Sequence, residues 1–188
     1  MGHRREDVVA TALGVLDRYG LADLTMRRLG AELGVRASAL YHHFPDKQHL
    51  LAAVADELLA RRAPVRADLP WAERVTEVCR GLRETLLAWT DAAELVATVQ
   101  AYGLGARAPY DDLRAALDEA GLPEDLAHTA ARTLLHLVLG HTTEEQLHLQ
   151  AVAAGALPGE PRLQPDFDLG LSLVLDGLRA RTGARASR

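Results

Sequence analysis

Several residue types are scarce in this 188-residue chain. It has one cysteine, Cys79, and only 4% aromatic residues, and no uncharged stretch approaches the roughly 20 apolar residues that a membrane span requires. A single cysteine excludes an intrachain disulfide and fits a reducing compartment. The shortage of aromatic residues, beside abundant alanine and leucine, favours helices over strands. The sequence therefore predicts an all-α protein without a transmembrane segment.

The charge distribution is uneven along the chain. The net charge is −5, but residues 1–62 carry nine Lys and Arg against eight Asp and Glu, whereas the remaining 126 carry twelve against eighteen. The acidity thus lies outside the first 62 residues, and the net charge does not exclude a nucleic-acid partner. The first residues turn acidic at Glu6 and Asp7, where a secretion signal would become apolar, so we expect a cytoplasmic protein.

Apolar residues recur with helical spacing along most of the chain. Thr25 and Asp46 stand where N-caps are expected, and Gly20 stands where the first helix should end. Four short helices are predicted in the first 62 residues, and longer amphipathic helices follow a proline-bracketed segment at 64–70. The predicted ranges are 8–19, 25–33, 37–43, 47–62, 71–89, 92–102, 110–120, 124–154 and 167–181.

Residues 24–44 have the pattern of a helix–turn–helix unit. Two short helices meet at Gly34, and the second is polar on its outer face. We expect the apolar residues to hold the angle between the helices: Leu29, Leu33, Val35, Leu40 and Phe44. The residues expected to project outward are Arg36, Ala37, Ser38, Tyr41 and His42.

The outward residues suit contacts to duplex DNA. Arg27 and Lys47 are placed to neutralise phosphates, and the Tyr41 hydroxyl can donate to a phosphate. Ala37, Ser38 and His42 are expected at the base edges, where sequence preference arises. A purely structural four-helix head, with its basic residues merely solvated, is the alternative.

The order of these motifs resembles the N-terminal domain of the tetracycline-repressor (TetR) family of bacterial transcriptional regulators. The resemblance rests on the capped second helix, the Gly-Val turn, the run from Ala39 to Phe44 and the segment from Asp46 to Leu51. It implies a homodimer with a three-helix DNA-binding head and a ligand-binding body. By position, the family's DNA contacts would fall on Thr25, Met26, Arg27, Ala37, Ser38, Tyr41, His42, His43 and Lys47.

The body also resembles the branch of the family that contains the tetracycline repressors. The likeness is carried by residues 136–148, with His136, Leu139, Gly140, Glu144 and His148 among them, and by the closing helix. In that branch these two helices pair across the dimer axis. The closing helix is apolar on more than one face, which also favours a partner. We therefore predict a head at 1–46, a linking helix at 47–62, and a ligand-binding and dimerisation body at 63–188.

The resemblance also bears on the ligand. Positions that hold the drug or its magnesium in that branch are apolar here, at Ala63, Val78 and Val96, although Glu144 stands at the matching acidic position. A polar drug would lose hydrogen bonds there, at about 1–3 kcal/mol each. We expect a more apolar effector and no metal or cofactor. The candidate ligand-binding residues, for each of which ordinary core packing is the stronger alternative, are Trp71, Val78, Leu82, Trp89, Val96, Gln100, Tyr102, Leu113, His136 and Leu139.

Two other classes of function compete with a regulator. A metal-dependent enzyme would use the residues that share one helical face, His141, Glu144, Glu145 and His148, but the sequence has only one Glu-x-x-His motif. A protein-interaction module without DNA binding would keep the same fold. We favour a non-enzymatic regulator, by family default a repressor, that leaves a near-palindromic operator when a small effector enters the body and shifts the linking helix.

Overall fold

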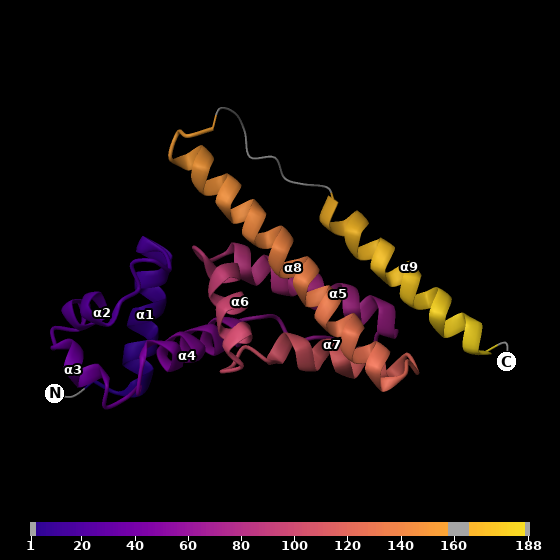
Figure 1. Ribbon diagram of the computed structural model, residues 1–188, viewed down its shortest axis with the longest axis horizontal. Coiled ribbons are helices and arrows are strands. Elements are labelled where there is room, and N and C mark those ends of the chain that lie inside the picture. The colour runs from indigo at the N-terminus through magenta and orange to yellow at the C-terminus, as the bar shows by residue number, and fades with distance from the viewer. Residues whose placement is uncertain (1–2, 158–165, 187–188) are drawn as a thin grey trace. The chain divides into compact units, whose positions relative to one another are not determined.

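The computed structural model describes residues 3–157 and 166–186, and within these residues all regular structure is helical (Figure 1). The all-α prediction is thus confirmed. No described helix is both long and apolar enough to cross a membrane. The helices are α1 (Arg5–Tyr19), α2 (Met26–Glu32), α3 (Ala37–Leu40), α4 (Lys47–Leu59), α5 (Trp71–Leu87), α6 (Ala92–Tyr102), α7 (Ala108–Glu119), α8 (Glu124–Ala153) and α9 (Asp166–Ala186).

The helices divide into two compact units. The first comprises Met1–Arg62 together with Thr85–Arg107, and the second comprises Ala63–Glu84 together with Ala108–Arg188. The first unit therefore contains the predicted head, the linking helix α4 and also α6, and α5 contributes residues to both units.

The first unit is built around α1. Its apolar stripe, which includes Val8, Ala12, Leu13 and Leu16, is fully buried or nearly so, and both α2 and α4 pack on this helix. The helix ends at Gly20, whose φ of +81° favours glycine and whose amide donates to the Leu16 carbonyl. This end positions the helix–turn–helix unit that follows.

Two aspartates attach α6 to the rest of the first unit. The Asp91 carboxylate accepts a 2.8 Å hydrogen bond from the amide of Leu21, and Thr90 donates a 2.8 Å bond to the carbonyl of Asp17. At the other end, the Asp56 carboxylate on α4 accepts a 2.7 Å bond from the amide of Ala106. Both ends of α6 are thereby held, and its apolar face packs on α4.

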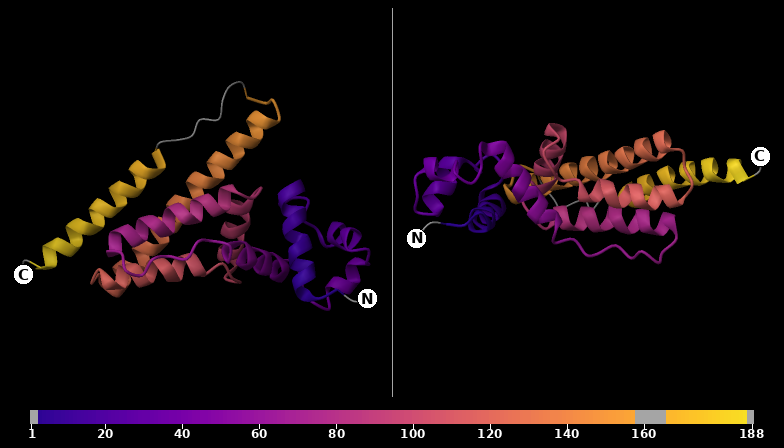
Figure 2. Two further views of the ribbon diagram at one scale, coloured as in Figure 1. Left: turned by 180° about the vertical axis from the view of Figure 1, so that it is seen from behind. Right: turned by 90° about the horizontal axis from the view of Figure 1, so that it is seen from below.

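The second unit is a set of long helices in which α8 packs against both α7 and α9 (Figure 2). Most of the buried residues of α8 are Ala, Leu or Val, but Thr142, Glu145 and Gln146 are buried too. On α9 one face is buried, through Phe167, Leu171, Leu175 and Leu178. The opposite face remains exposed, with Leu169 and Leu173 at 60% and 66%.

Candidate functional site

The helix–turn–helix unit is held at a fixed angle by close packing between α2 and α3. Thr25 caps α2 by accepting a hydrogen bond from the amide of Arg28 at 3.1 Å, which confirms the predicted cap. A Cβ added at Gly30 would lie 2.8 Å from the carbonyl oxygen of Val35, so only glycine allows this approach. Of the five apolar residues predicted to hold the angle, Leu29, Leu40 and Phe44 are buried, whereas Leu33 and Val35 are half-buried.

The surface beside α3 carries the residues predicted to meet DNA. We call it the recognition face; its members with exposed side chains are Thr25, Arg27, Arg36, Ser38, Tyr41 and His42, and its half-buried members are Ala37, His43 and Lys47. Met26, also predicted as a contact, is only 8% exposed and packs in the core, since it opens α2 on its apolar side. Its side chain is thus directed away from the recognition face.

The cations of the recognition face have no acidic partners. Within residues 3–157 and 166–186, the side chains of Arg27, Arg36 and Lys47 make neither an ion pair nor a hydrogen bond, although acidic residues are numerous in the chain. Arg28, by contrast, binds Asp23 at 2.9 Å and stacks on the Tyr19 ring. The three unpaired cations are available to neutralise phosphates, whereas the charge of Arg28 is already paired with Asp23.

The helix that begins beside this face, α4, is capped by Asp46. Its carboxylate accepts hydrogen bonds of 2.8 Å from the amide and from the ring Nδ1 of His49, which confirms the predicted cap. These bonds stabilise the charged form and lower the pKa of the Asp46 carboxyl. The cap fixes the first turn of α4, from which Lys47 projects.

The candidate ligand-binding residues are divided between the two units. Trp89, Val96, Gln100 and Tyr102 belong to the first unit, and the second holds Trp71, Val78, Leu82, Leu113, His136 and Leu139. Val78, Leu82, Val96, Leu113 and Leu139 are buried, whereas Trp71, Trp89 and Gln100 are half-buried. Tyr102 is 57% exposed, and His136 is exposed on α8 because it lies on the side of that helix opposite its buried stripe.

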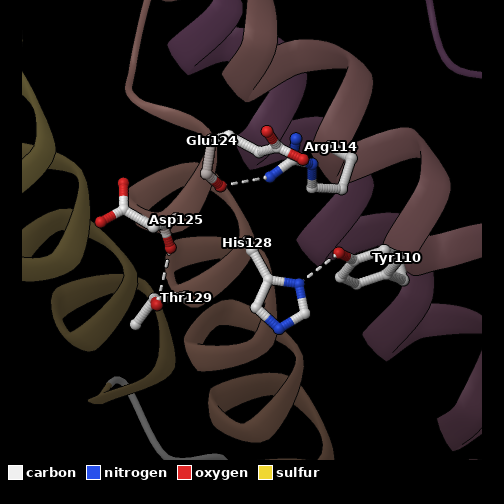
Figure 3. Close-up of a pocket in the computed structure, with 6 residues that line it drawn as sticks. All are labelled: Tyr110, Arg114, Glu124, Asp125, His128 and Thr129. Atoms are coloured by element: carbon white, nitrogen blue, oxygen red, sulfur yellow. Dashed lines mark hydrogen bonds between the residues drawn. The ribbon is translucent and has the colours of Figure 1, made fainter.

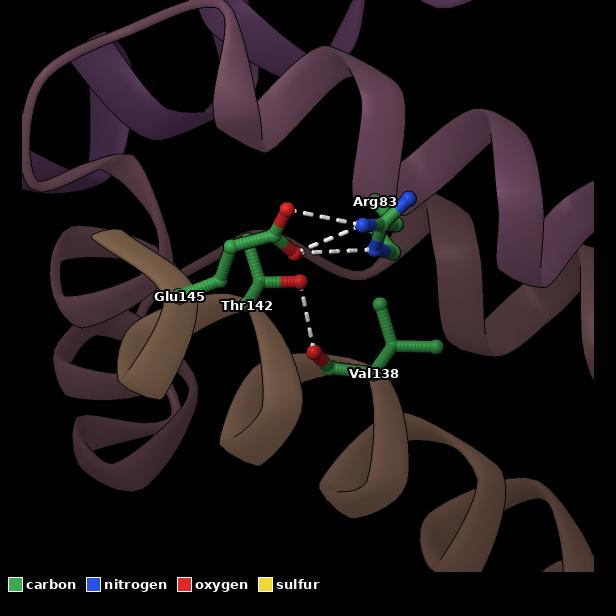
Figure 4. Close-up of polar contacts among 4 residues, drawn as sticks. All are labelled: Arg83, Val138, Thr142 and Glu145. Atoms are coloured by element: carbon green, nitrogen blue, oxygen red, sulfur yellow. Dashed lines mark hydrogen bonds and ion pairs between the residues drawn. The ribbon is translucent and has the colours of Figure 1, made fainter. Parts of the chain in front are cut away.

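A buried ion pair joins α5 to α8 (Figure 4). The Arg83 guanidinium donates to both carboxylate oxygens of Glu145, with a shortest distance of 2.6 Å, and it also lies over the ring of Phe167. Glu145 is 7% exposed, so removing Arg83 would leave a buried carboxylate uncompensated and destabilise the fold. Sequence spacing groups Glu145 with a possible metal cluster; in the described part of the chain, no three His, Cys, Asp or Glu side chains are arranged to hold a metal.

A surface hollow of about 680 Å³ lies beside α7 and the start of α8 (Figure 3). Its lining is polar, and the Tyr110 hydroxyl and the His128 ring nitrogen Nδ1 are 2.7 Å apart in it. Arg114 donates to the carbonyl of Glu124 at 2.9 Å and also pairs with Asp118. None of the predicted ligand-binding residues lines this hollow.

Comparison with known proteins matches both parts of the chain to one family. Residues 8–54 match the family described as bacterial regulatory proteins, tetR family, and residues 63–161 match the tetracyclin repressor-like C-terminal domain. The class A tetracycline repressor from transposon 1721 of Escherichia coli is 31% identical, over 93% of this chain and 89% of that protein.

Solved structures extend the match to the whole fold. BioQ of Mycobacterium smegmatis superposes with a TM-score of 0.88 at 45% identity, over 95% of this chain and 98% of that one. BioQ with its double-stranded DNA operator gives a TM-score of 0.83 at 43% identity, over 94% and 98%. ActR of Streptomyces coelicolor in complex with (S)-DNPA gives 0.77 at 30% identity, over 96% and 98%.

Proposed function

Because the chain belongs to the TetR family of bacterial regulatory proteins, we propose that it binds a near-palindromic DNA operator as a homodimer and leaves it when a small molecule binds the body. The protein is a DNA-binding transcriptional regulator, and we propose that it represses transcription. We further assign it a cytoplasmic location, because its proposed partner is DNA. We assign it no catalytic reaction, because binding alone accounts for the features of the recognition face.

One observation carries the DNA-binding proposal: the recognition face presents three cations without partners around exposed hydrogen-bonding side chains. Arg27, Arg36 and Lys47 would bind backbone phosphates, and the Tyr41 hydroxyl would donate to another. Ser38 and His42 would meet base edges in the major groove. The structure of BioQ with its operator supports this assignment, since the match covers 94% of the present chain.

The test begins with selection of bound duplexes from a random pool, which supplies the operator. We expect Tyr41→Ala and Lys47→Ala to weaken operator binding in a gel-retardation assay at least tenfold, because each removes a phosphate-binding group from both subunits. Arg18→Ala is the matched control, since Arg18 is an exposed cation on α1 outside the recognition face. Unchanged retardation by both variants, with the dimer intact, would refute the DNA-binding face.

We propose that the effector is largely apolar and enters among buried apolar side chains of the body, such as Val78, Leu82 and Leu113. Its binding would shift α5, which carries Val78 and Leu82 and continues into the first unit, and the shift would reach α4 through α6, which packs on α4. Such coupling between two sites typically amounts to about 1–3 kcal/mol and is reciprocal. A screen for compounds that release the selected operator, followed by binding of each hit with and without DNA, measures it.

The main alternative is a protein-interaction module that does not bind DNA. The two are distinguished by salt, because an interface that neutralises phosphates weakens steeply as salt rises and an apolar interface does not. Retention on duplex DNA at about 50 mM and about 200 mM salt therefore decides between them.

A further inference from the structure

Residues 3–5, which lead into the first turn of α1, are docked on the helix–turn–helix unit. The ring Nε2 of His3 donates a hydrogen bond of 2.8 Å to the carbonyl of Leu33, the residue that ends α2. Two residues later, the guanidinium of Arg5 lies 4.7 Å from the centre of the Phe44 ring. Leu33 and Phe44 flank α3 in the sequence, so residues 3–5, which we call the arm, contact the chain on either side of α3.

The arm carries two cations that no acidic side chain neutralises. Within the described residues, neither Arg4 nor Arg5 forms an ion pair, and both side chains are exposed. The nearest acids in sequence are Glu6 and Asp7, and the Asp7 carboxylate accepts a 2.8 Å hydrogen bond from the backbone amide of Arg4 instead of binding a guanidinium. The stack of Arg5 on Phe44 orients its guanidinium while leaving its N–H groups able to donate.

We infer that the arm is a second DNA-contacting element, in which Arg4 and Arg5 bind backbone phosphates beside those bound by the recognition face. Arg5 is held against Phe44, which follows α3 and lies three positions before Lys47 in the sequence. His3 is a positioning residue: its bond to Leu33 fixes the arm in place. The inference rests on the proposed DNA-binding function and adds a contact that helix–turn–helix spacing does not predict.

Salt dependence of operator binding tests this inference. The full-length dimer is measured on the selected operator and on a random-sequence duplex, unaltered and as Arg4→Gln/Arg5→Gln. Log affinity falls with log salt by about 0.9 per neutralised phosphate, so removing both cations from both subunits should make this slope less negative by about 3.6. The change should be similar on both duplexes, because phosphates carry no sequence information. His3→Ala should weaken binding with a smaller change in slope, since both cations remain.

Arg18→Gln is the control for the loss of a cation elsewhere on α1, because it removes one positive charge per subunit at the other end of the helix, about 20 Å away. Circular dichroism and melting of each variant show whether the head is folded. If the double variant leaves the slope unchanged while Lys47→Ala still weakens binding, the arm does not contact DNA, and the proposed function is unaffected. A change in sequence preference instead of slope would also overturn the proposed phosphate contacts of the arm, since it would place the arm on bases. If Lys47→Ala and the double variant both leave binding unchanged, the DNA-binding proposal itself fails.

Discussion

At the scale of single residues, the Asp46 cap makes the stability of the head depend on pH. Its pKa is lowered in the folded state by bonds from His49, so the unfolded chain takes up the proton more readily. The stabilisation is present above the ordinary carboxyl pKa of 3.8 and is lost as the pH falls through the lower folded value. We therefore expect Asp46→Ala to melt at a lower temperature than the unaltered protein at about pH 6.

The same difference in melting temperature should shrink as the pH is lowered from about 5 to about 2. Asp46→Asn, which retains an acceptor oxygen but does not titrate, is the control for the cap geometry. A difference between Asp46→Ala and the unaltered chain that stays constant over this range would contradict the role of the charged carboxylate.

Residues with local roles were the ones that the sequence could predict. Thr25 and Asp46 each lie just before a helix, and a cap needs only its own first turn, so position suffices to identify it. Asp56 and Asp91 bind amides 50 and 70 residues away, and nothing in the neighbouring sequence reports such partners. The docked arm escaped prediction for the same reason, because His3 binds a carbonyl 30 residues further along.

At the scale of elements, the approach of α2 to α3 depends on Gly30. An added methyl group would lie 2.8 Å from the carbonyl oxygen of Val35 and 3.1 Å from the amide of Ala37, and backbone cannot yield as a flexible side chain can. We expect Gly30→Ala to destabilise the fold by about 1–3 kcal/mol, measured by urea unfolding, and to weaken operator binding because α3 is displaced.

Gly14→Ala is the matched control for that substitution. Gly14 is exposed within α1 and has no atom within 4 Å of an added Cβ, so alanine there should stabilise the protein by about 0.5–1 kcal/mol. Equal effects of the two substitutions would show that helix propensity, and not the contact with Val35, determines the result.

The extents of the helices were predictable where apolar periodicity is long. The range predicted for α6, residues 92–102, is the observed one, and α8 ends one residue earlier than predicted. The short elements differ more: α3 contains only residues 37–40, because residues 41–43 form a turn before Phe44, and α4 ends at Leu59 instead of residue 62. α3 has only four residues, which is too short for the spacing of apolar residues to show where the helix begins and ends.

At the scale of the whole molecule, the exposed apolar face of α9 bears on dimerisation. Leu169 and Leu173 are one helical turn apart and largely exposed, and such side chains stabilise an assembly by about 1.5–3 kcal/mol each when buried. We expect Leu169→Glu/Leu173→Glu to raise the dimer dissociation constant more than about a thousandfold, measured by sedimentation equilibrium. Operator binding should weaken as well, because the operator is bound by the dimer.

Arg179→Glu serves as the control for added negative charge on α9, since Arg179 is exposed and its ion pair with Asp176 lies on the same helix. A dimer that persists in the double glutamate variant at micromolar concentration would place the subunit interface elsewhere.

The grouping of the helices into units could not be predicted from the sequence. Composition and prolines mark a change near residue 63, where the second unit begins. The return of residues 85–107 to the first unit depends on Asp17, Leu21 and Asp56, whose contacts with that segment exist only in the folded chain. Amphipathic spacing shows that a helix has a face to bury, but it does not identify the neighbour.

This discontinuous unit has a consequence for protein engineering. A chimera that transplants residues 1–62 onto a foreign sensor would leave the amide of Leu21 and the carboxylate of Asp56 without the groups they bind here. A graft that also carries residues 85–107 would preserve both bonds. Builders of biosensors from this scaffold should therefore exchange two stretches of gene, not one.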